Sequence, residues 1–146
     1  MKIEVNQSNK IEQTSKDTII GLANEKSFTI LINRKIKRKL QEGFRRQGKP
    51  RLFSYRTFVG GIILAFKYAK IKPSEVVIDE EYPGKEKMLH SMFLEMWGRI
   101  FGKAPEVSFE RIGKKSKVHG VCYKAMKSGK ADKVISFEEL RHLTLK

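Results

Sequence analysis

Residues 75–79 read Glu-Val-Val-Ile-Asp, a short apolar run that ends in a carboxylate. A run of this kind is typical of a central strand that is covered on both faces. Pro73-Ser74 ends the preceding segment, and the strand carries Asp79 to its carboxyl end. Because ligands in open α/β sheets often bind where strands lead into loops, Asp79 occupies a candidate functional position.

The residues after this strand carry the strongest helical pattern of the chain. Residues 84–101 space methionine and aromatic side chains at i, i+1, i+4 and i+5, which predicts a helix packed on the core. Residues 107–112 alternate and predict a further strand. Ser116 is expected to cap a helix that ends near Ser128. A capping box at 136–139 predicts a last helix over Phe137–Leu145.

The residues before this strand predict a hairpin and then two helices. Residues 17–23 and 27–32 are β-branched or aromatic runs separated by a short polar turn. Residues 34–46 predict a basic surface helix, with a twisted continuation of the hairpin as the alternative. Residues 55–68, capped by Ser54, predict a buried helix whose Gly60-Gly61 pair permits a close approach.

The composition is that of one globular domain. The chain has 146 residues, of which 40% are hydrophobic and 32% are charged. Residues 1–16 lack apolar periodicity and predict a mobile amino-terminal arm or a short edge strand, which leaves 17–146 as a single α/β domain. One cysteine, Cys122, excludes an internal disulfide. No apolar run reaches membrane-spanning length, so we expect a cytoplasmic protein without a membrane partner.

Positive charge is concentrated in two blocks of the sequence. The formal net charge is +15; residues 34–56 hold ten cations against one anion, and residues 111–133 hold eight against one. Such clustering is the electrostatic footprint of a nucleic-acid binder. Aromatic residues lie among these cations, which favours a single strand. The candidate contact residues are Arg34, Lys35, Arg38, Arg45, Arg46, Lys49, Arg51, Tyr55, Lys114, Lys115 and Lys117.

We expect the two blocks to converge on one groove that follows a sugar–phosphate chain. The alternative is a solvated basic face with its aromatic residues buried. A further hypothesis is an assembly protein whose basic surface contacts an acidic protein. The composition is also compatible with a homo-oligomer.

An acidic cluster, Asp79-Glu80-Glu81, follows the central strand. Carboxylates grouped in this way can hold Mg²⁺ or Mn²⁺, which orient a phosphodiester and activate water. Asp79 and Glu81 are the expected metal ligands, with no other cofactor implied. The alternative is a loop whose acids cap the next helix and soften the positive field.

A second candidate lies at residues 111–119, where a strand leads through a glycine-containing loop to a helix start. Free N–H groups at such a start suit a phosphate. His119 falls in the first turn, from which it can point toward the acids as a metal ligand or general acid/base. On its own, a histidine at this position is more often a surface or capping residue.

In its element order, the chain from Asp17 onward resembles the ribonuclease H-like superfamily of nucleases, transposases and integrases. The resemblance rests on the opening hairpin, on Asp79 at the end of a central strand and on the helical segment after residues 107–112. It implies a mixed sheet with an antiparallel amino-terminal hairpin and flanking helices. It also implies a metal site with Asp79 as the second ligand and His119 as the third.

The sequence departs from that family's pattern at the first strand. Residues 18–24 offer Asn24 where the family has an aspartate, with Glu25 beside it and Asp17 at the start of the strand. A two-metal site would then lack an anionic ligand. We therefore expect single-stranded DNA or RNA binding first, and metal-dependent phosphodiester hydrolysis by Asp79, Glu80 or Glu81, and His119 second.

Overall fold

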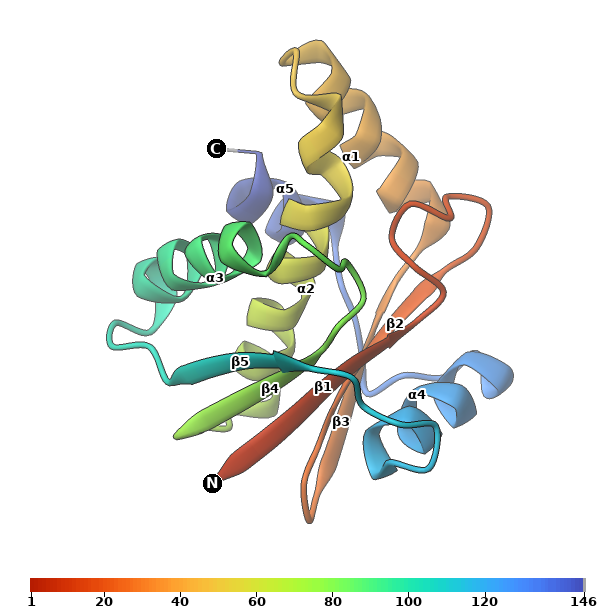
Figure 1. Ribbon diagram of the computed structural model, residues 1–146. Coiled ribbons are helices and arrows are strands. Elements are labelled where there is room, and N and C mark those ends of the chain that lie inside the picture. The colour runs from red at the N-terminus through yellow and green to blue at the C-terminus, as the bar shows by residue number, and fades with distance from the viewer. Residues whose placement is uncertain (146) are drawn as a thin grey trace.

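One six-stranded mixed sheet organises the protein, whose computed structural model describes residues 1–145 (Figure 1). Strands β1 (Lys2–Ser8), β2 (Thr18–Ala23) and β3 (Ser27–Ile32) are antiparallel neighbours. Strand β4 (Glu75–Asp79) pairs with β1 in parallel, β5 (Glu106–Glu110) pairs with β4, and β6 (Lys133–Val134) pairs with β3. The strand order is β5-β4-β1-β2-β3-β6.

Helices cover both faces of the sheet unequally. The face that more helices cover carries α1 (Arg34–Arg46), the 3-10 turn η1 (Pro50–Leu52), α2 (Phe53–Ala69), α3 (Glu86–Ile100) and α5 (Phe137–Thr144). The opposite face carries α4 (Lys117–Ser128), which packs Val118, Cys122 and Ala125 on the outer side of β2 and β3. Within residues 1–145, the helices lack the length and apolar character that a membrane span requires.

The amino-terminal segment corrects our expectation of a mobile arm or edge strand. Strand β1 lies in the interior of the sheet, between β2 and β4, and the side chains of Ile3 and Val5 are fully buried. Ile11, in the loop that follows, is also fully buried. Residues 1–16 therefore supply part of the core of the domain.

The local signals downstream of residue 17 are largely confirmed. The hairpin forms, and β4 has the expected bounds. Ser116 Oγ accepts a hydrogen bond from the His119 N–H, and the capping box of Ser136 with Glu139 is complete. Helix α2 begins at Phe53 without a side-chain cap, because η1 leads directly into it.

Two glycines set the distance between the sheet and its helices. A Cβ atom on Gly61 of α2 would lie 2.4 Å from Ile20 Cδ1 on β2. On the other face, a Cβ atom on Gly21 of β2 would lie 2.5 Å from Cys122 Sγ on α4. Neither position has room for a methyl group, so both helices pack directly against the strands.

Replacing Gly61 should therefore destabilise the fold. We expect Gly61→Ala to lower the free energy of unfolding by about 1–3 kcal/mol, because the methyl group overpacks the α2–sheet contact. Gly98 in α3 has no atom within 4 Å of its virtual Cβ, so Gly98→Ala should be neutral or should stabilise by about 0.5–1 kcal/mol. Urea denaturation of both variants measures the difference; equal effects would contradict the close packing.

Candidate functional site

Asp79 ends β4 and ties the acidic loop to the neighbouring strand. Its Oδ1 atom accepts a hydrogen bond of 2.8 Å from the backbone N–H of Ile112, just beyond β5. The N–H of Glu80 donates to the carbonyl of Glu110 at 2.9 Å. These contacts hold the loop close to the end of β5, while the Glu80 side chain itself is exposed.

Glu81 turns back toward Asp79, and the two carboxyl groups hydrogen bond to each other. Burial, the hydrogen bond to Asp79 and the charge of Asp79 raise the pKa of Glu81 to about 8. At neutral pH, Glu81 is therefore largely protonated and can donate to Asp79. The predicted metal ligands Asp79 and Glu81 thus come together, as a carboxyl pair that shares a proton.

Two amide side chains of β1 lie beside this carboxyl pair. In the β1–β4 register Val5 pairs with Ile78, so Asn6 comes level with Asp79. Gln7 is 7% exposed, and its amide donates to Tyr82 Oη at 3.4 Å and hydrogen bonds to Glu81. Within residues 1–145, Gln7 Oε1 is buried without a hydrogen-bond partner. Such an atom can accept from water or bind a cation.

Tyr82 anchors the acidic loop to the core. Its hydroxyl donates to Glu12 Oε1 at 2.9 Å, and its ring packs edge-on against Tyr55 and Phe58 at centroid distances of 5.3 and 5.4 Å. Burial and the nearby acids raise the pKa of Tyr82, so its hydroxyl stays protonated. Tyr55 is therefore half-buried in a packing cluster, not freely available for stacking as the sequence predicted.

A buried lysine holds the loop of residues 9–17 in place. Lys37 of α1 is fully buried, and its ammonium donates to the Gln13 carbonyl at 2.8 Å and to Thr18 Oγ1 at 2.9 Å. Burial lowers the pKa of Lys37 to about 8, against the opposing attraction of Asp17 and Glu12. This cation therefore serves the structure and is unavailable to a ligand.

His119 does not join the acids. Its backbone N–H is capped by Ser116 at 3.2 Å, and no carboxylate of residues 1–145 lies within ion-pair distance of its ring. Across that part of the chain, no three side chains of His, Cys, Asp or Glu are grouped to share a metal ion. Asp79 and Glu81 can supply oxygen ligands together with Gln7 Oε1, and His119 does not complete that set.

Asn24, which the sequence analysis compared with the first-strand aspartate of the ribonuclease H-like superfamily, does not lie beside Asp79. Asn24 lies in the β2–β3 turn, and Ala23 pairs with Glu4 near the start of β1. Asp79 lies at the other end of β1, so Asn24 and Glu25 are at the wrong end of the sheet. The neighbour of Asp79 is Asn6, which the sequence reasoning missed because β1 was assigned to an arm. The alternation of Ile3 and Val5 is the signal that could have revealed it.

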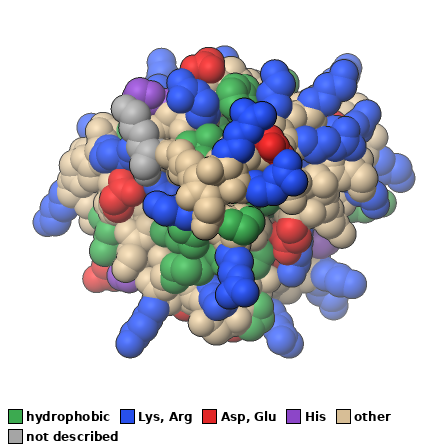
Figure 2. Space-filling model, turned by 90° about the horizontal axis from the view of Figure 1, so that it is seen from above, with side chains coloured by type: hydrophobic (Ala, Val, Ile, Leu, Met, Phe, Trp, Pro, Cys, Tyr) green, Lys and Arg blue, Asp and Glu red, His purple; other side chains and the backbone are tan. Residues whose placement is uncertain are grey.

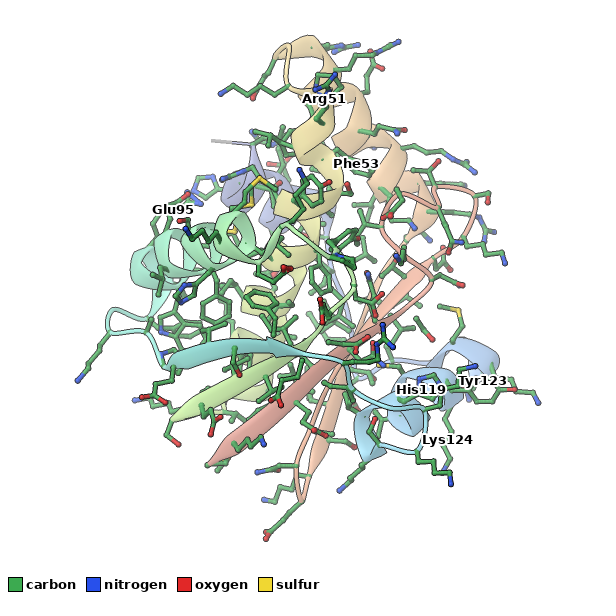
Figure 3. All side chains as sticks on the ribbon, viewed as in Figure 1. Arg51, Phe53, Glu95, His119, Tyr123 and Lys124 are labelled. Carbon is green, nitrogen blue, oxygen red and sulfur yellow. The ribbon has the colours of Figure 1, made fainter. Side chains whose placement is uncertain are left out.

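The two basic blocks lie in different layers. The first forms a helical arm (residues 34–56, comprising α1, η1 and the start of α2) that projects beyond the sheet, and the second surrounds α4 on the opposite face (Figures 1 and 3). The expectation of one shared groove is therefore not met. Seen from above, Lys and Arg side chains are spread over the face that includes this arm, with several Asp and Glu side chains and apolar groups among them (Figure 2).

Burial also changes the role of the aromatic residues near these cations. Phe44 and Phe53 are only 1% and 3% exposed, and they pack on each other in the core at 6.2 Å. Tyr123 on α4 is 55% exposed. The aromatic residues that lie among the cations in the sequence are Phe44, Phe53, Tyr55 and Tyr123, and Tyr123 is the most exposed of the four.

Comparisons of the chain with protein-family models, with curated proteins and with solved structures give no match. The functional interpretation therefore rests on the residues and contacts of this chain.

The proton shared by Asp79 and Glu81 should make stability depend on pH. Between pH 4.5 and 8 the folded protein retains a proton on Glu81 that the unfolded chain has released, so the free energy of unfolding falls as pH rises through this window. Glu81→Gln keeps a donor for Asp79 without titrating. We expect the free energy of unfolding of this variant to lack the part of the decline that is due to Glu81. The variant should therefore be more stable than the wild type above pH 8.

Glu80→Gln is the matched control, because Glu80 is exposed on the same loop. It should follow the wild-type pH profile in thermal or urea denaturation. A Glu81→Gln profile that parallels the wild type would contradict the shared proton.

Proposed function

We propose that the protein is a nucleic-acid-binding protein of ribonuclease H-like fold that holds the phosphate backbone through its helical arm. The observation that carries this proposal is the excess of exposed cations over acids on the arm. Helix α1 alone presents Arg34, Lys35, Arg38, Arg45 and Arg46, and Lys49 and Arg51 follow at its tip; all seven are exposed. A polyanion that neutralises them releases counterions and gains affinity at moderate salt.

The ion pairs of the chain leave most of this charge free. In residues 1–145 six arginines and no lysine form ion pairs, among them Arg45 and Arg46, which share Glu42 at 2.5 and 3.3 Å. Exposed pairs of this kind contribute little to stability. Lys35, Lys49 and Arg51 are exposed and form no ion pair with residues 1–145. Functional selection explains such a surface better than stability does.

The topology supports the ribonuclease H-like assignment. The chain opens with antiparallel strands, and β4, which ends in Asp79, pairs in parallel with the first of them. Helix α4 follows β5 and covers the opposite face of the sheet. These features match the hairpin, the acid-bearing central strand and the carboxyl-terminal helical segment on which the resemblance rests.

Neutralising the tip of the arm should weaken binding to every sequence tested. In Lys49→Gln/Arg51→Gln, the negative slope of log affinity against log salt should become shallower by about 1.4–1.8, because two phosphate contacts are lost. Fluorescence anisotropy with labelled oligonucleotides over a salt series measures this slope. These two residues are chosen because their removal breaks no ion pair within residues 1–145.

Lys87→Gln/Lys103→Gln is the control, since it removes the same charge from exposed positions at the two ends of α3. It should leave the salt slope near its wild-type value. Equal slopes for both double variants would assign binding to net charge, and absent or salt-insensitive binding would favour an assembly protein with an acidic partner.

Metal-dependent phosphodiester hydrolysis is the second candidate, and one observation favours it. Gln7 hydrogen bonds to Glu81, and its Oε1 atom, which has no hydrogen-bond partner within residues 1–145, adds an oxygen donor near the Asp79–Glu81 pair. Oxygen ligands of this kind suit Mg²⁺ or Mn²⁺, and a bound cation would displace the shared proton. The residues fit one hard cation better than two, because Asn6 stands where a further carboxylate would be needed.

Asp79→Asn tests this candidate. If the protein hydrolyses phosphodiesters, labelled single-stranded DNA or RNA should be degraded with Mn²⁺ and spared with chelator, and the variant should lose at least about 100-fold in rate because it loses an anionic ligand. The variant should still bind oligonucleotide as the wild type does. Cleavage at the wild-type rate would refute the role of Asp79.

A further inference from the structure

The face of the sheet opposite the helical arm holds a groove that the proposed function does not use. It lies between α4, the start of β3 and the turn that leads to β6, with a volume of about 850 Å³. Val121 and Ala125 line it, together with the three serines Ser27, Ser116 and Ser128. Grooves of this size accommodate organic ligands or a short stretch of a polymer.

Four lysines line this groove: Lys117, Lys124, Lys127 and Lys130. All four are exposed, and none forms an ion pair with residues 1–145. Lys117 is partly committed, because its ammonium donates to the carbonyl of Glu25. The other three remain available to an anionic ligand.

The one acid of the groove does not neutralise these lysines. Asp132 Oδ2 accepts hydrogen bonds from the backbone N–H of Thr29 at 2.8 Å and from Thr29 Oγ1 at 3.1 Å. Its own N–H donates to Thr29 Oγ1 at 3.1 Å. Asp132 thus fastens the β6 turn to β3; it is exposed but forms no ion pair with these lysines within residues 1–145.

Tyr123 supplies an aromatic surface at the same groove. Its side chain extends from α4 beside Lys124 (Figure 3), and 55% of the residue is exposed. Lys127 Nζ lies 5.8 Å from the centre of the ring. A planar group stacked on Tyr123 would therefore have the Lys127 ammonium nearby.

We propose that this groove binds a single-stranded segment of nucleic acid, with one base stacked on Tyr123 and the adjoining phosphates on Lys124, Lys127 and Lys130. Bases stack on exposed aromatic rings whatever their sequence, and lysines track the backbone. A duplex cannot use Tyr123 in this way, because its bases are already stacked inside the helix. The proposal rests on the proposed function only in requiring that the protein meets nucleic acid.

The test uses three variants of the full chain with labelled oligothymidylate and a duplex of equal length. Tyr123→Ala should lower affinity for the single strand roughly 10-fold and leave duplex affinity unchanged. Tyr123→Phe keeps the ring and should bind as the wild type does. Lys124→Gln/Lys127→Gln should reduce the single-strand salt slope by about 1.4. Tyr123 and both lysines are exposed, so unchanged melting temperatures are expected for all three.

The outcomes separate this proposal from the proposed function. Loss of duplex binding in Lys49→Gln/Arg51→Gln, with no effect of Tyr123→Ala on either probe, would overturn the proposal that the groove binds a single strand. It would leave the proposed role of the arm intact. Poly-glutamate that displaces the oligonucleotide as well as unlabelled oligothymidylate does would identify the groove as a general anion surface and also overturn the proposal. Single-strand binding that depends on Tyr123 but not on the arm residues would support the groove and refute the arm.

Discussion

The central position of β1 is the constraint on which the rest of the structure depends. This strand pairs with β2 on one side and with β4 on the other, so it joins the antiparallel half of the sheet to the parallel half. Its register with β4 brings Asn6 and Gln7 beside Asp79 and Glu81. Burial raises the pKa of Glu81 there, and its carboxyl group keeps a proton that it shares with Asp79.

The position of the sheet between the two basic blocks explains how the protein tolerates its surplus of positive charge. Like charges gathered on one surface would repel strongly in the free protein. Here the two basic blocks are separated by the whole sheet, with the helical arm on one side and α4 on the other. A cation that does enter the core, Lys37, is surrounded by oxygen atoms, and its pKa is lowered. Separation across the sheet thus allows two strongly basic surfaces in one small domain.

The sequence was informative wherever one local signal decided the structure. The apolar run of β4, the Ser116 cap and the Ser136–Glu139 capping box were predicted and found. The interior position of strand β1 was missed, and the segment was predicted as a mobile arm or a short edge strand, because its carboxyl half, Asn6 to Ser8, is polar and the burial of those residues depends on strands distant in the sequence. The error at Asn24 followed from it. The burial of Phe53 and the half-burial of Tyr55 could not be predicted, because only tertiary packing distinguishes an aromatic core residue from a stacking surface.

The separation of the two basic surfaces also limits how a single polymer could engage both. The loop of residues 9–17 touches each side: Lys37 of α1 bonds its carbonyls, and Asn9 Nδ2 contacts Met126 Sδ of α4 at 3.2 Å. This loop carries exposed Lys10 and Lys16, and Lys10 Nζ bonds the carbonyl of Glu81 at 3.0 Å. A strand that runs from the arm to the α4 groove over this loop would pass the Asp79–Glu81 pair. The acidic pair therefore lies on a path between two cationic surfaces, where ionised carboxylates would repel a phosphate and a protonated Glu81 repels it less.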